Sequence, residues 1–439
     1  MFKLFSDSDF IKLVQASAAR KAEASKRIRY YHDEQLDELY KIISRRWSRP
    51  EDFRLFCVNV IKKITDKRAM VYRAPPTRVF EGMDQAAGEA LYGAMGADIT
   101  LKRANRLTKL LKTTALKVGW NGTGPTLAVV TPNVLDVVAD DPENPTRIIV
   151  THAAALPEWV EYSDWTASGY RRLDFRGRPM QRRDNPDDVN PYDILPFIGL
   201  FDRAPDDEFF LPGGDDLVSS QEALNVALVN LQRAVELQSH GQSWATGLTP
   251  GDALRSGPDH TIILPEGSQF GFAAPNTPVG ACLQFIEFLL RQTAIANDLS
   301  ADVFDLSKRS ESGAAKLMES RDLIEARQDD IELWRRYEAR LFEVLKAVVN
   351  THSPGTIPQD ARLRVDFGEP QETLSENARI EAYARRISLG MWSPVDALMA
   401  DNRDLKTREE AAAILEMRKA ETARFLPTTT TPAYGTPGQ

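Results

Sequence analysis

Cysteine, histidine and long apolar runs are all scarce in this sequence, and each scarcity argues against a class of protein. The two cysteines, Cys57 and Cys282, lie far apart and offer no disulfide framework. The five histidines never share a metal-ligand spacing, so we expect no zinc site. No apolar run approaches the roughly 18 residues that a membrane-spanning helix needs. Asp7 and Asp9 interrupt the N-terminus where a secretion signal needs an apolar core, so we expect the chain to stay where it is made.

The motifs of nucleotide-binding and hydrolytic enzymes are also missing. The segment GWNGTGPT (119–126) lacks the lysine of a phosphate-binding loop, and its glycines favour a turn before a strand. A dinucleotide fingerprint and a Gly-x-Ser-x-Gly elbow are absent as well. His152 follows an apolar strand and is interpreted as structural rather than as a general base. We therefore predict no catalytic residues, no cofactor and no metal.

Pairs of carboxylates keep one enzymatic alternative open. Metal-dependent nucleases use such pairs to hold two cations. In this chain each acidic cluster sits in a turn rich in Pro or Gly, which favours a solvated loop. A nuclease or hydrolase on an α+β scaffold stays the alternative and requires these carboxylates to converge. The clusters are Asp140–Asp141, Asp187–Asp188, Asp206–Glu208 and Asp215–Asp216.

The net charge is -8, which argues against a protein that coats DNA. Such proteins need clustered Lys and Arg to displace counterions from phosphates. The most basic segment, Lys102 to Lys117, is interpreted as the solvated face of a helix. A conduit for DNA, by contrast, is expected to avoid strong phosphate contacts.

Apolar spacing predicts helices over most of the first 120 residues. One covers Leu36 to Ile43, a second follows a capping box at Ser48 and Glu51 and runs through Ile64, and a third runs from Leu91 to a C-cap at Gly119. Residues 120–200 predict four to six short antiparallel strands, with a hairpin turning near Gly177.

After Pro196 the pattern predicts helices again. A helix from residue 215 to 239 carries the stripe Leu217, Leu224, Leu228, Leu231 and Val235. After an insert with strands within TIILPEGSQFGF (261–272), a second helix runs from 279 to about 297, with a polar face of Gln284, Glu287 and Arg291. Its remaining surface is so widely apolar that we expect neighbouring subunits to cover it.

A very long helix follows a loop at about 299–310. Its heptad-like stripe is Leu317, Ile324, Ile331, Trp334, Leu341, Leu345 and Val348. One strand is predicted at RLRVDF (362–367). Further helices are predicted from Glu376 to Leu389, after the cap Ser393 with Pro394, and after a capping box at Thr407 and Glu410. The tail 426–439 has no means of burying itself and is expected to be flexible.

This order of elements resembles the portal proteins of tailed bacteriophages. The segments that carry the resemblance are DEQLDELY (33–40), NVIKKITDKRAMVY (59–72), GGDDL (213–217), SGAAKLMESRDLIEARQDDIELW (312–334) and RIEAYARRISLGMWSPVDAL (379–398). The likeness covers about residues 10–425 and lies in the architecture more than in single motifs.

The resemblance implies a mainly helical α+β portal-type fold that assembles as a ring. Its parts would be a wing (1–210 with 312–370), a first stem helix (211–239), a clip (240–278), a second stem helix (279–298), a tunnel loop (299–311), a crown (371–425) and the flexible tail (426–439). Portal rings usually contain twelve subunits and form the channel at one capsid vertex through which double-stranded DNA enters and leaves.

The resemblance also implies partners and contact residues. The partners would be the terminase large subunit, which hydrolyses ATP, head-tail adaptor proteins, the major capsid protein and a scaffolding protein, in the virion and in the host cytoplasm during assembly. The tunnel-loop residues nearest DNA would be Asp305, Ser307, Lys308, Arg309, Ser310 and Glu311. Glu287 and Arg291 would serve the stem, and Trp244, Arg255 and His260 the clip. A helical scaffold or adaptor that binds only protein is the remaining alternative.

Overall fold

The computed structural model describes residues 7–152, 154–240, 242–247, 264, 266–273, 279–304, 313–368, 376–402, 405 and 407–425. The chain divides into two units, Met1–Gly368 and Glu369–Gln439, and each is described by itself. Helices are combined with small antiparallel sheets, which confirms the predicted mixed α+β class. The predicted flexible tail, 426–439, lies outside the described residues.

The N-terminal part of the first unit is built from short helices. α3 confirms the helix predicted around Leu36 to Ile43, with Leu39 and Ile43 buried against α7. The elements in order are α1 (Asp7–Ala16), α2 (Ala18–Tyr31), α3 (Leu36–Arg46), η1 (Pro50–Asp52), α4 (Val60–Arg68), η2 (Val71–Arg73), β1 (Thr77–Glu81), α5 (Gln85–Ala94) and α6 (Ala97–Leu111).

The helix predicted to begin at Ser48 and Glu51 and to run through Ile64 is confirmed in its last part by α4, but its predicted start is wrong. After the single turn of η1 the chain stays irregular until α4. Asn59 caps α4, because its side chain accepts a hydrogen bond from the backbone N–H of Lys62 at 2.9 Å. The same side chain donates to the carbonyl of Tyr30 at 3.0 Å, so a contact with α2 decides where α4 begins.

The helix predicted from Leu91 to Gly119 is wrong in two places. Gly96 adopts a left-handed φ of 59° and separates α5 from α6. α6 then ends at Leu111, because Lys112 has a φ of 68° and turns the chain into a strand. The hydroxyls of Thr108 and Thr114 lie 2.7 Å apart across this turn.

Two antiparallel sheets follow, in the strand orders β3-β2-β8 and β4-β5-β6-β7. They confirm the predicted group of short strands and the turn at Gly177, whose φ is 78°. β8 contradicts the helix expected directly after Pro196, since its five residues pair with β2. The strands are β2 (Thr113–Trp120), β3 (Pro125–Val130), β4 (Leu135–Val138), β5 (Arg147–His152), β6 (Glu161–Thr166), β7 (Tyr170–Leu173) and β8 (Phe197–Phe201), with η3 (Pro157–Trp159) before β6.

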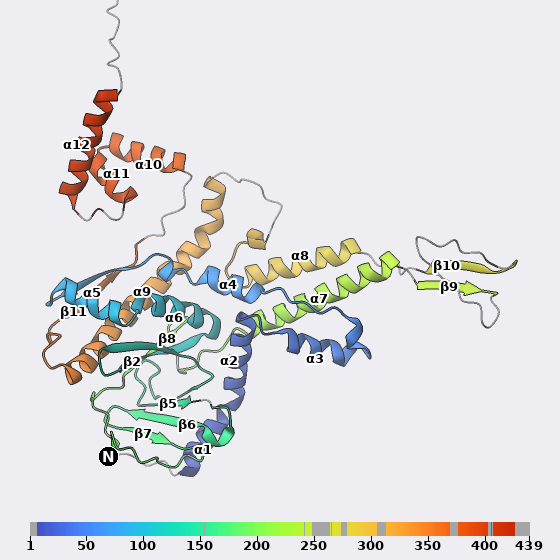
Figure 1. Ribbon diagram of the computed structural model, residues 1–439, viewed down its shortest axis with the longest axis horizontal. Helices are drawn as coiled ribbons and strands as arrows, with labels where there is room; N and C mark the ends of the chain where they lie inside the picture. Colours follow the sequence, from blue (N-terminus) through green and yellow to red (C-terminus); the bar gives the residue numbers. More distant parts are fainter. Residues whose placement is uncertain are drawn as a thin grey trace, which may run out of the picture. The chain divides into compact units, whose positions relative to one another are not determined.

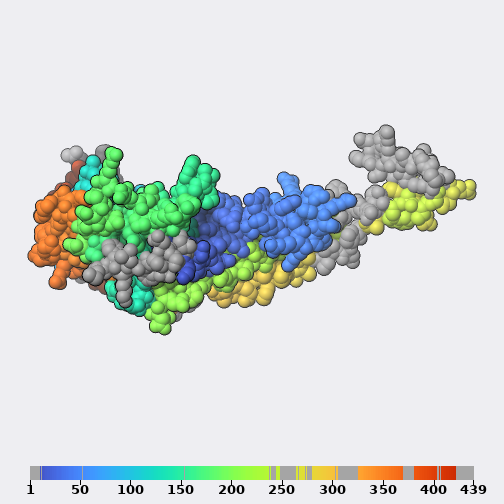
Figure 2. Space-filling model, turned by 90° about the horizontal axis from the view of Figure 1, so that it is seen from below, coloured from blue at the N-terminus to red at the C-terminus, as the bar shows by residue number. Residues whose placement is uncertain are grey.

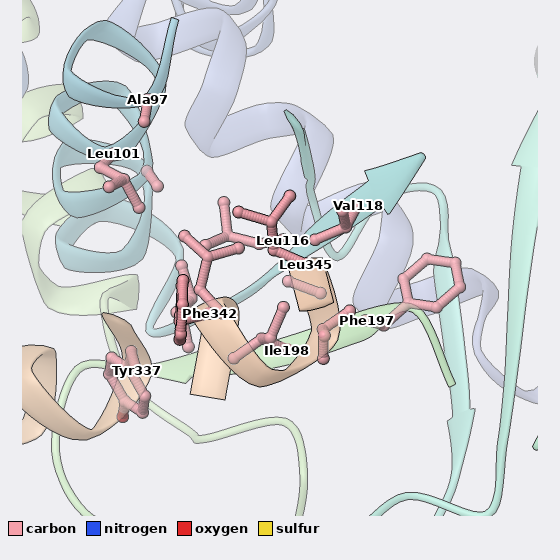
Figure 3. Packing of buried hydrophobic residues seen from close by; sticks show 14 of the residues in the cluster. Ala97, Leu101, Leu116, Val118, Phe197, Ile198, Tyr337, Phe342 and Leu345 are labelled. Carbon is pink, nitrogen blue, oxygen red and sulfur yellow. The ribbon is translucent and has the colours of Figure 1, made fainter. Parts of the chain in front are cut away.

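The long helix α9 (Gly313–His352) organises the main core. Its 40 residues span about 60 Å. Five residues of the predicted stripe are buried, namely Ile331, Trp334, Leu341, Leu345 and Val348. Figure 3 shows Phe342 and Leu345 packed against Leu116 of β2 and Ile198 of β8. The predicted return strand is β11 (Arg362–Asp366), which pairs antiparallel with β1.

The helices α7 (Asp215–His240) and α8 (Val279–Ile295) lie side by side and project from the sheets (Figure 1). In Figure 2 this pair runs beneath the blue N-terminal helices. The insert between them contains the antiparallel hairpin of β9 (Gln242–Thr246) and β10 (Gln269–Ala273). After α8, the turn η4 (Ala301–Phe304) packs back onto the helix pair through Leu299, Val303 and Phe304.

The second unit contains α10 (Glu376–Ser388), α11 (Pro394–Asp401) and α12 (Arg408–Phe425). Ser393 caps α11 in a reciprocal capping box with Asp396, as predicted from Ser393 and Pro394. The hydroxyl of Thr407 accepts from the backbone N–H of Glu410 at 3.3 Å at the start of α12. These local caps set the helix ends of this unit.

Candidate assembly surface

The helices α7 and α8 form the candidate site because a buried inner face is combined with an uncovered apolar outer face. Leu217 and Leu224 of α7 share one core cluster with Ile286 of α8. Further along the predicted stripe of α7, burial decreases, and Val235 is 42% exposed. The end of the helix pair that leads to the insert is therefore the less covered end.

Two buried amides of α7 join the helix pair to the N-terminal segment. Gln221 accepts at its Oε1 from the backbone N–H groups of Val60 and Ile61, at 2.8 and 3.2 Å. Asn225 accepts from the backbone N–H of Val58 at 3.2 Å. These bonds satisfy backbone donors at the start of α4 that have no partner within the helix. The sequence analysis missed both residues, because a polar residue beside an apolar stripe predicts exposure.

The outer face of α8 is apolar and open to solvent. Phe285, Phe288 and Ile295 are 55%, 56% and 53% exposed, and Leu283 is 47% exposed. The buried residues of α8 are only Ile286, Thr293 and Ala294, within the part of the chain that the structure describes. The predicted polar face is also exposed, so apolar and polar residues share the open surface. An apolar surface of this kind marks a site of interaction.

A groove of about 810 Å³ runs between α3 and α8, with α7 as its floor. Three small residues, Ala223, Ala227 and Ala234, lie on the floor, at spacings of four and seven that share one helix face. Phe285 of α8 and Arg46 of α3 belong to opposite walls. Because small side chains permit a short distance between helix axes, the floor suits an incoming helix. This alanine spacing is legible in the sequence, although the sequence analysis did not use it.

We call Phe288 and Ile295 the ridge. They are seven residues apart and therefore lie on the same face of α8. Neither is among the described residues that line the groove. The helix pair thus presents two different apolar surfaces, one projecting and one hollow.

The predicted stem residues lie beside the ridge. Glu287 and Arg291 are both exposed, and no ion pair joins these two described side chains. Their exposure leaves both charges available to a partner.

The predicted clip residues are described only in part. Trp244 of β9 is 43% exposed and sits opposite Gly271 of β10. A Cβ atom on Gly271 would come within 2.9 Å of the Trp244 ring, so the ring covers the glycine. Trp244 is thus a local packing residue with an open side, while Arg255 and His260 lie outside the described residues.

The predicted tunnel loop is described as far as Phe304, where it forms the packed turn η4. The DNA-facing residues predicted on it lie outside the described residues. They are Asp305, Ser307, Lys308, Arg309, Ser310 and Glu311.

The basic segment from Lys102 to Lys117 was predicted to be the solvated face of a helix. This prediction is wrong for the second half of the segment, where lysines form ion pairs. Lys109 lies 2.8 Å from carboxylate oxygens of both Asp202 and Asp330, and Lys112 lies 2.8 Å from Asp202. Burial alone would raise the pKa of Asp202, but the two ammonium groups outweigh it and lower that pKa. The end of α6 faces these carboxylates, which compensate the burial of its lysines.

Lys117 lies between the two sheets and has no carboxylate at ion-pair distance among the described residues. Its Nζ is 4.8 Å from the ring centroid of Trp165 and 5.7 Å from that of Phe197. Burial, and after it the charge of Arg172, lowers the pKa of Lys117 to about 8. The cation–π contacts with the two rings compensate only part of the hydration that the buried ammonium group of Lys117 loses.

We expect Lys117→Met to raise the free energy of unfolding at about pH 7 by about 1–3 kcal/mol, since one pKa unit corresponds to about 1.4 kcal/mol. The unfolded lysine keeps its proton to a higher pH than the folded one, so wild-type stability rises with pH above about 8. Urea unfolding of both chains at about pH 7 and about pH 9.5 tests this. An advantage of the variant that does not shrink at the higher pH contradicts it.

The acidic clusters do not converge on one site. Asp141 accepts from the side chain of Asn144 and the backbone N–H of Glu143, which lowers its pKa, and Asp215 pairs with Arg27. Among the described residues, no group of three or more His, Cys, Asp or Glu side chains is arranged to hold a metal ion. In the same part of the chain, no helix is long and apolar enough to cross a membrane.

Comparisons with known proteins give no family. No family model and no curated protein matches the chain. Among solved structures, it is similar to a chain of one described as "Virion of native gene transfer agent (GTA) particle". The identity is 13% and the TM-score 0.46, over 76% of this chain and 86% of that chain.

Proposed function

We propose that this chain is a phage portal protein, whose copies join through α7 and α8 into a closed ring of twelve around a channel for double-stranded DNA. The observation that carries the proposal is the pair of unlike apolar surfaces, the ridge and the groove, on one helix pair. A contact between two different surfaces of the same chain is heterologous, and such contacts generate a ring when the rotation between subunits closes.

The charges around the two surfaces support this contact. Arg46 lies on a wall of the groove, and Glu287 directly precedes the ridge residue Phe288. Both charged side chains are exposed. A ridge seated in a neighbour's groove would bring unlike charges together at its rim, which favours one orientation over the reverse.

The resemblance of the sequence to portal proteins supplies the rest of the proposal. The ring would occupy one vertex of the capsid, conduct DNA during packaging and ejection, and contact the major capsid and scaffolding proteins. The insert 240–278 would dock the terminase large subunit and later the head-tail adaptors. The terminase would supply ATP hydrolysis, and the subunit itself would perform no catalysis.

Electron microscopy of the purified chain, classified without imposed symmetry, tests the proposal. We expect rings of about twelve subunits with an open channel of about 20–25 Å, the width that a hydrated duplex requires. Single subunits or dimers at micromolar concentration would contradict ring formation. Assemblies without an open channel would favour a protein-only scaffold, and DNA cleavage with magnesium or manganese would favour the nuclease.

A further inference from the structure

The hairpin that follows β7 concentrates positive charge in a chain of negative net charge. Residues 175–183 contain four arginines and no lysine, aspartate or glutamate, whereas the whole chain carries -8. The arginines are Arg176, Arg178, Arg182 and Arg183.

The hairpin is a defined turn on the edge strand of the four-stranded sheet, where β7 is seen in Figure 1. Asp174 accepts from the backbone N–H groups of Arg176 and Arg178, both at 2.8 Å. Gly177 supplies the left-handed φ of 78° that the turn requires. The returning segment bonds to β7 through the N–H of Met180, which donates to the carbonyl of Arg172 at 2.9 Å. The arginines of the turn therefore project from a fixed backbone.

The arginines divide into paired and available ones. Arg182 is held by Asp184 and by the hydroxyl of Tyr170, the latter at 2.8 Å. Arg171 and Arg172 of β7 pair with Asp164 and Glu161, at 2.8 and 3.6 Å. By contrast, three side chains are exposed and have no ion pair with any described residue. They are Arg176, Arg178 and Arg183.

The carboxylates around the hairpin form no ion pair with these three arginines among the described residues. Burial lowers the pKa of Lys117 and of His152, and the charge of Arg172 lowers both further. The acidic groups nearest in sequence are Asp174, whose Oδ1 accepts from the turn, and Asp184, which already holds Arg182. Asp187 and Asp188 follow and lie beside β7, where the carbonyl of Asp188 accepts from the N–H of Tyr170. An anionic partner would thus meet three guanidinium groups that form no ion pair with a described residue.

We infer that this hairpin is a docking site for the phosphate backbone of double-stranded DNA. The planar guanidinium group binds phosphate through two parallel hydrogen bonds, and this segment uses arginine to the exclusion of lysine. The guanidinium of Arg176 lies 4.9 Å from the centroid of the Phe175 ring, so Arg176 competes with a single-stranded base for stacking on this ring. Contacts of this kind position a duplex without reading its sequence. The site belongs to a single subunit and does not depend on ring assembly.

Fluorescence anisotropy of a labelled duplex of about 20 base pairs, titrated with the full chain at about 50–200 mM salt, tests the inference. The variant changes Arg176, Arg178 and Arg183 to Gln. Each phosphate contact contributes about 0.9 to the slope of log affinity against log salt, so the variant should lose about 2.7 of this slope. It should also bind at least tenfold more weakly at the lowest salt.

A matched control removes three other exposed charges, with Lys62, Lys102 and Arg103 changed to Gln on α4 and α6. This control should keep the wild-type slope, and circular dichroism should show both variants folded. An equal loss of slope and affinity in the control overturns the inference. A wild-type chain that binds no duplex overturns it as well, and this second outcome points to an acidic protein surface as the partner. Equally tight binding of a single strand through the same arginines also overturns it.

Discussion

Changing both ridge residues, Phe288 and Ile295, to Gln is expected to leave single subunits in place of the proposed ring. Both side chains are more than half exposed in the single chain, so the fold itself should tolerate the change. Burying one such side chain in a neighbour's groove contributes about 1.5–3 kcal/mol. Losing two should weaken each subunit contact at least 100-fold, since each 1.4 kcal/mol is about tenfold. Sedimentation velocity at micromolar concentration measures the result.

The control and a mixing experiment separate this contact from general surface hydrophobicity. Ile99 of α6 is 80% exposed and lies off the helix pair, so Ile99→Gln should leave the ring intact. Ala227→Trp should fill the groove and also prevent assembly. Because each variant keeps one intact surface, mixing the two should give heterodimers that grow no further. Rings from either variant alone would contradict a contact between ridge and groove.

Changing Arg78 to Met is expected to lower the free energy of unfolding by about 3–5 kcal/mol. Glu338 of α9 is completely buried and accepts from the Nε of Arg78 at 2.7 Å and from the hydroxyl of Tyr72 at 2.8 Å. Without Arg78 the buried carboxyl group has only the tyrosine as a described donor. Urea unfolding followed by tryptophan fluorescence suits this site, because the ring of Trp334 lies 5.1 Å from that of Tyr72.

A double variant distinguishes an unpaired charge from lost packing. Glu338→Gln removes the charge but keeps an acceptor for Tyr72, so adding it to Arg78→Met should recover most of the loss. Arg336→Met on the same helix is the control, since Arg336 pairs with Glu143 at 3.1 Å with both side chains largely exposed. Its effect should stay below about 1 kcal/mol. A double variant no more stable than Arg78→Met alone would show that packing, not charge, dominates.

Long amphipathic patterns were read correctly from the sequence. α7 and α9 cover the predicted helices, and α8 covers its predicted helix except for the last two residues. The buried stripe from Ile331 to Val348 lies where its spacing predicts. The wide apolar surface of α8 was also evident, together with its need for cover. Side-chain spacing in a long helix repeats over many turns, so it outweighs local exceptions.

Short elements and buried polar groups could not be predicted from the sequence. β8 is a short run of four apolar residues and one glycine that fits either a helix or a strand, and its pairing with β2 makes it a strand. The end of α6 depends on the positive φ of Lys112. The start of α4 depends on the cap residue Asn59, which contacts α2, and on Gln221, which accepts from the N–H of Val60. The partners of Lys109 lie 93 and 221 residues along the chain, at Asp202 and Asp330.

The sequence by itself determined the class of the fold, the long helices and the surplus apolar surface of α8, because periodicity and composition are local properties. Only the tertiary structure decided that this surface divides into a ridge and a groove, since the groove needs α3, α7 and α8 together. It likewise decided which charges are available. Lys109 and Arg78 form ion pairs in the interior, whereas Arg176 and Arg178 are exposed on a turn of defined backbone geometry. Whether a charge is paired depends on residues far away in the chain, and folding alone brings them together.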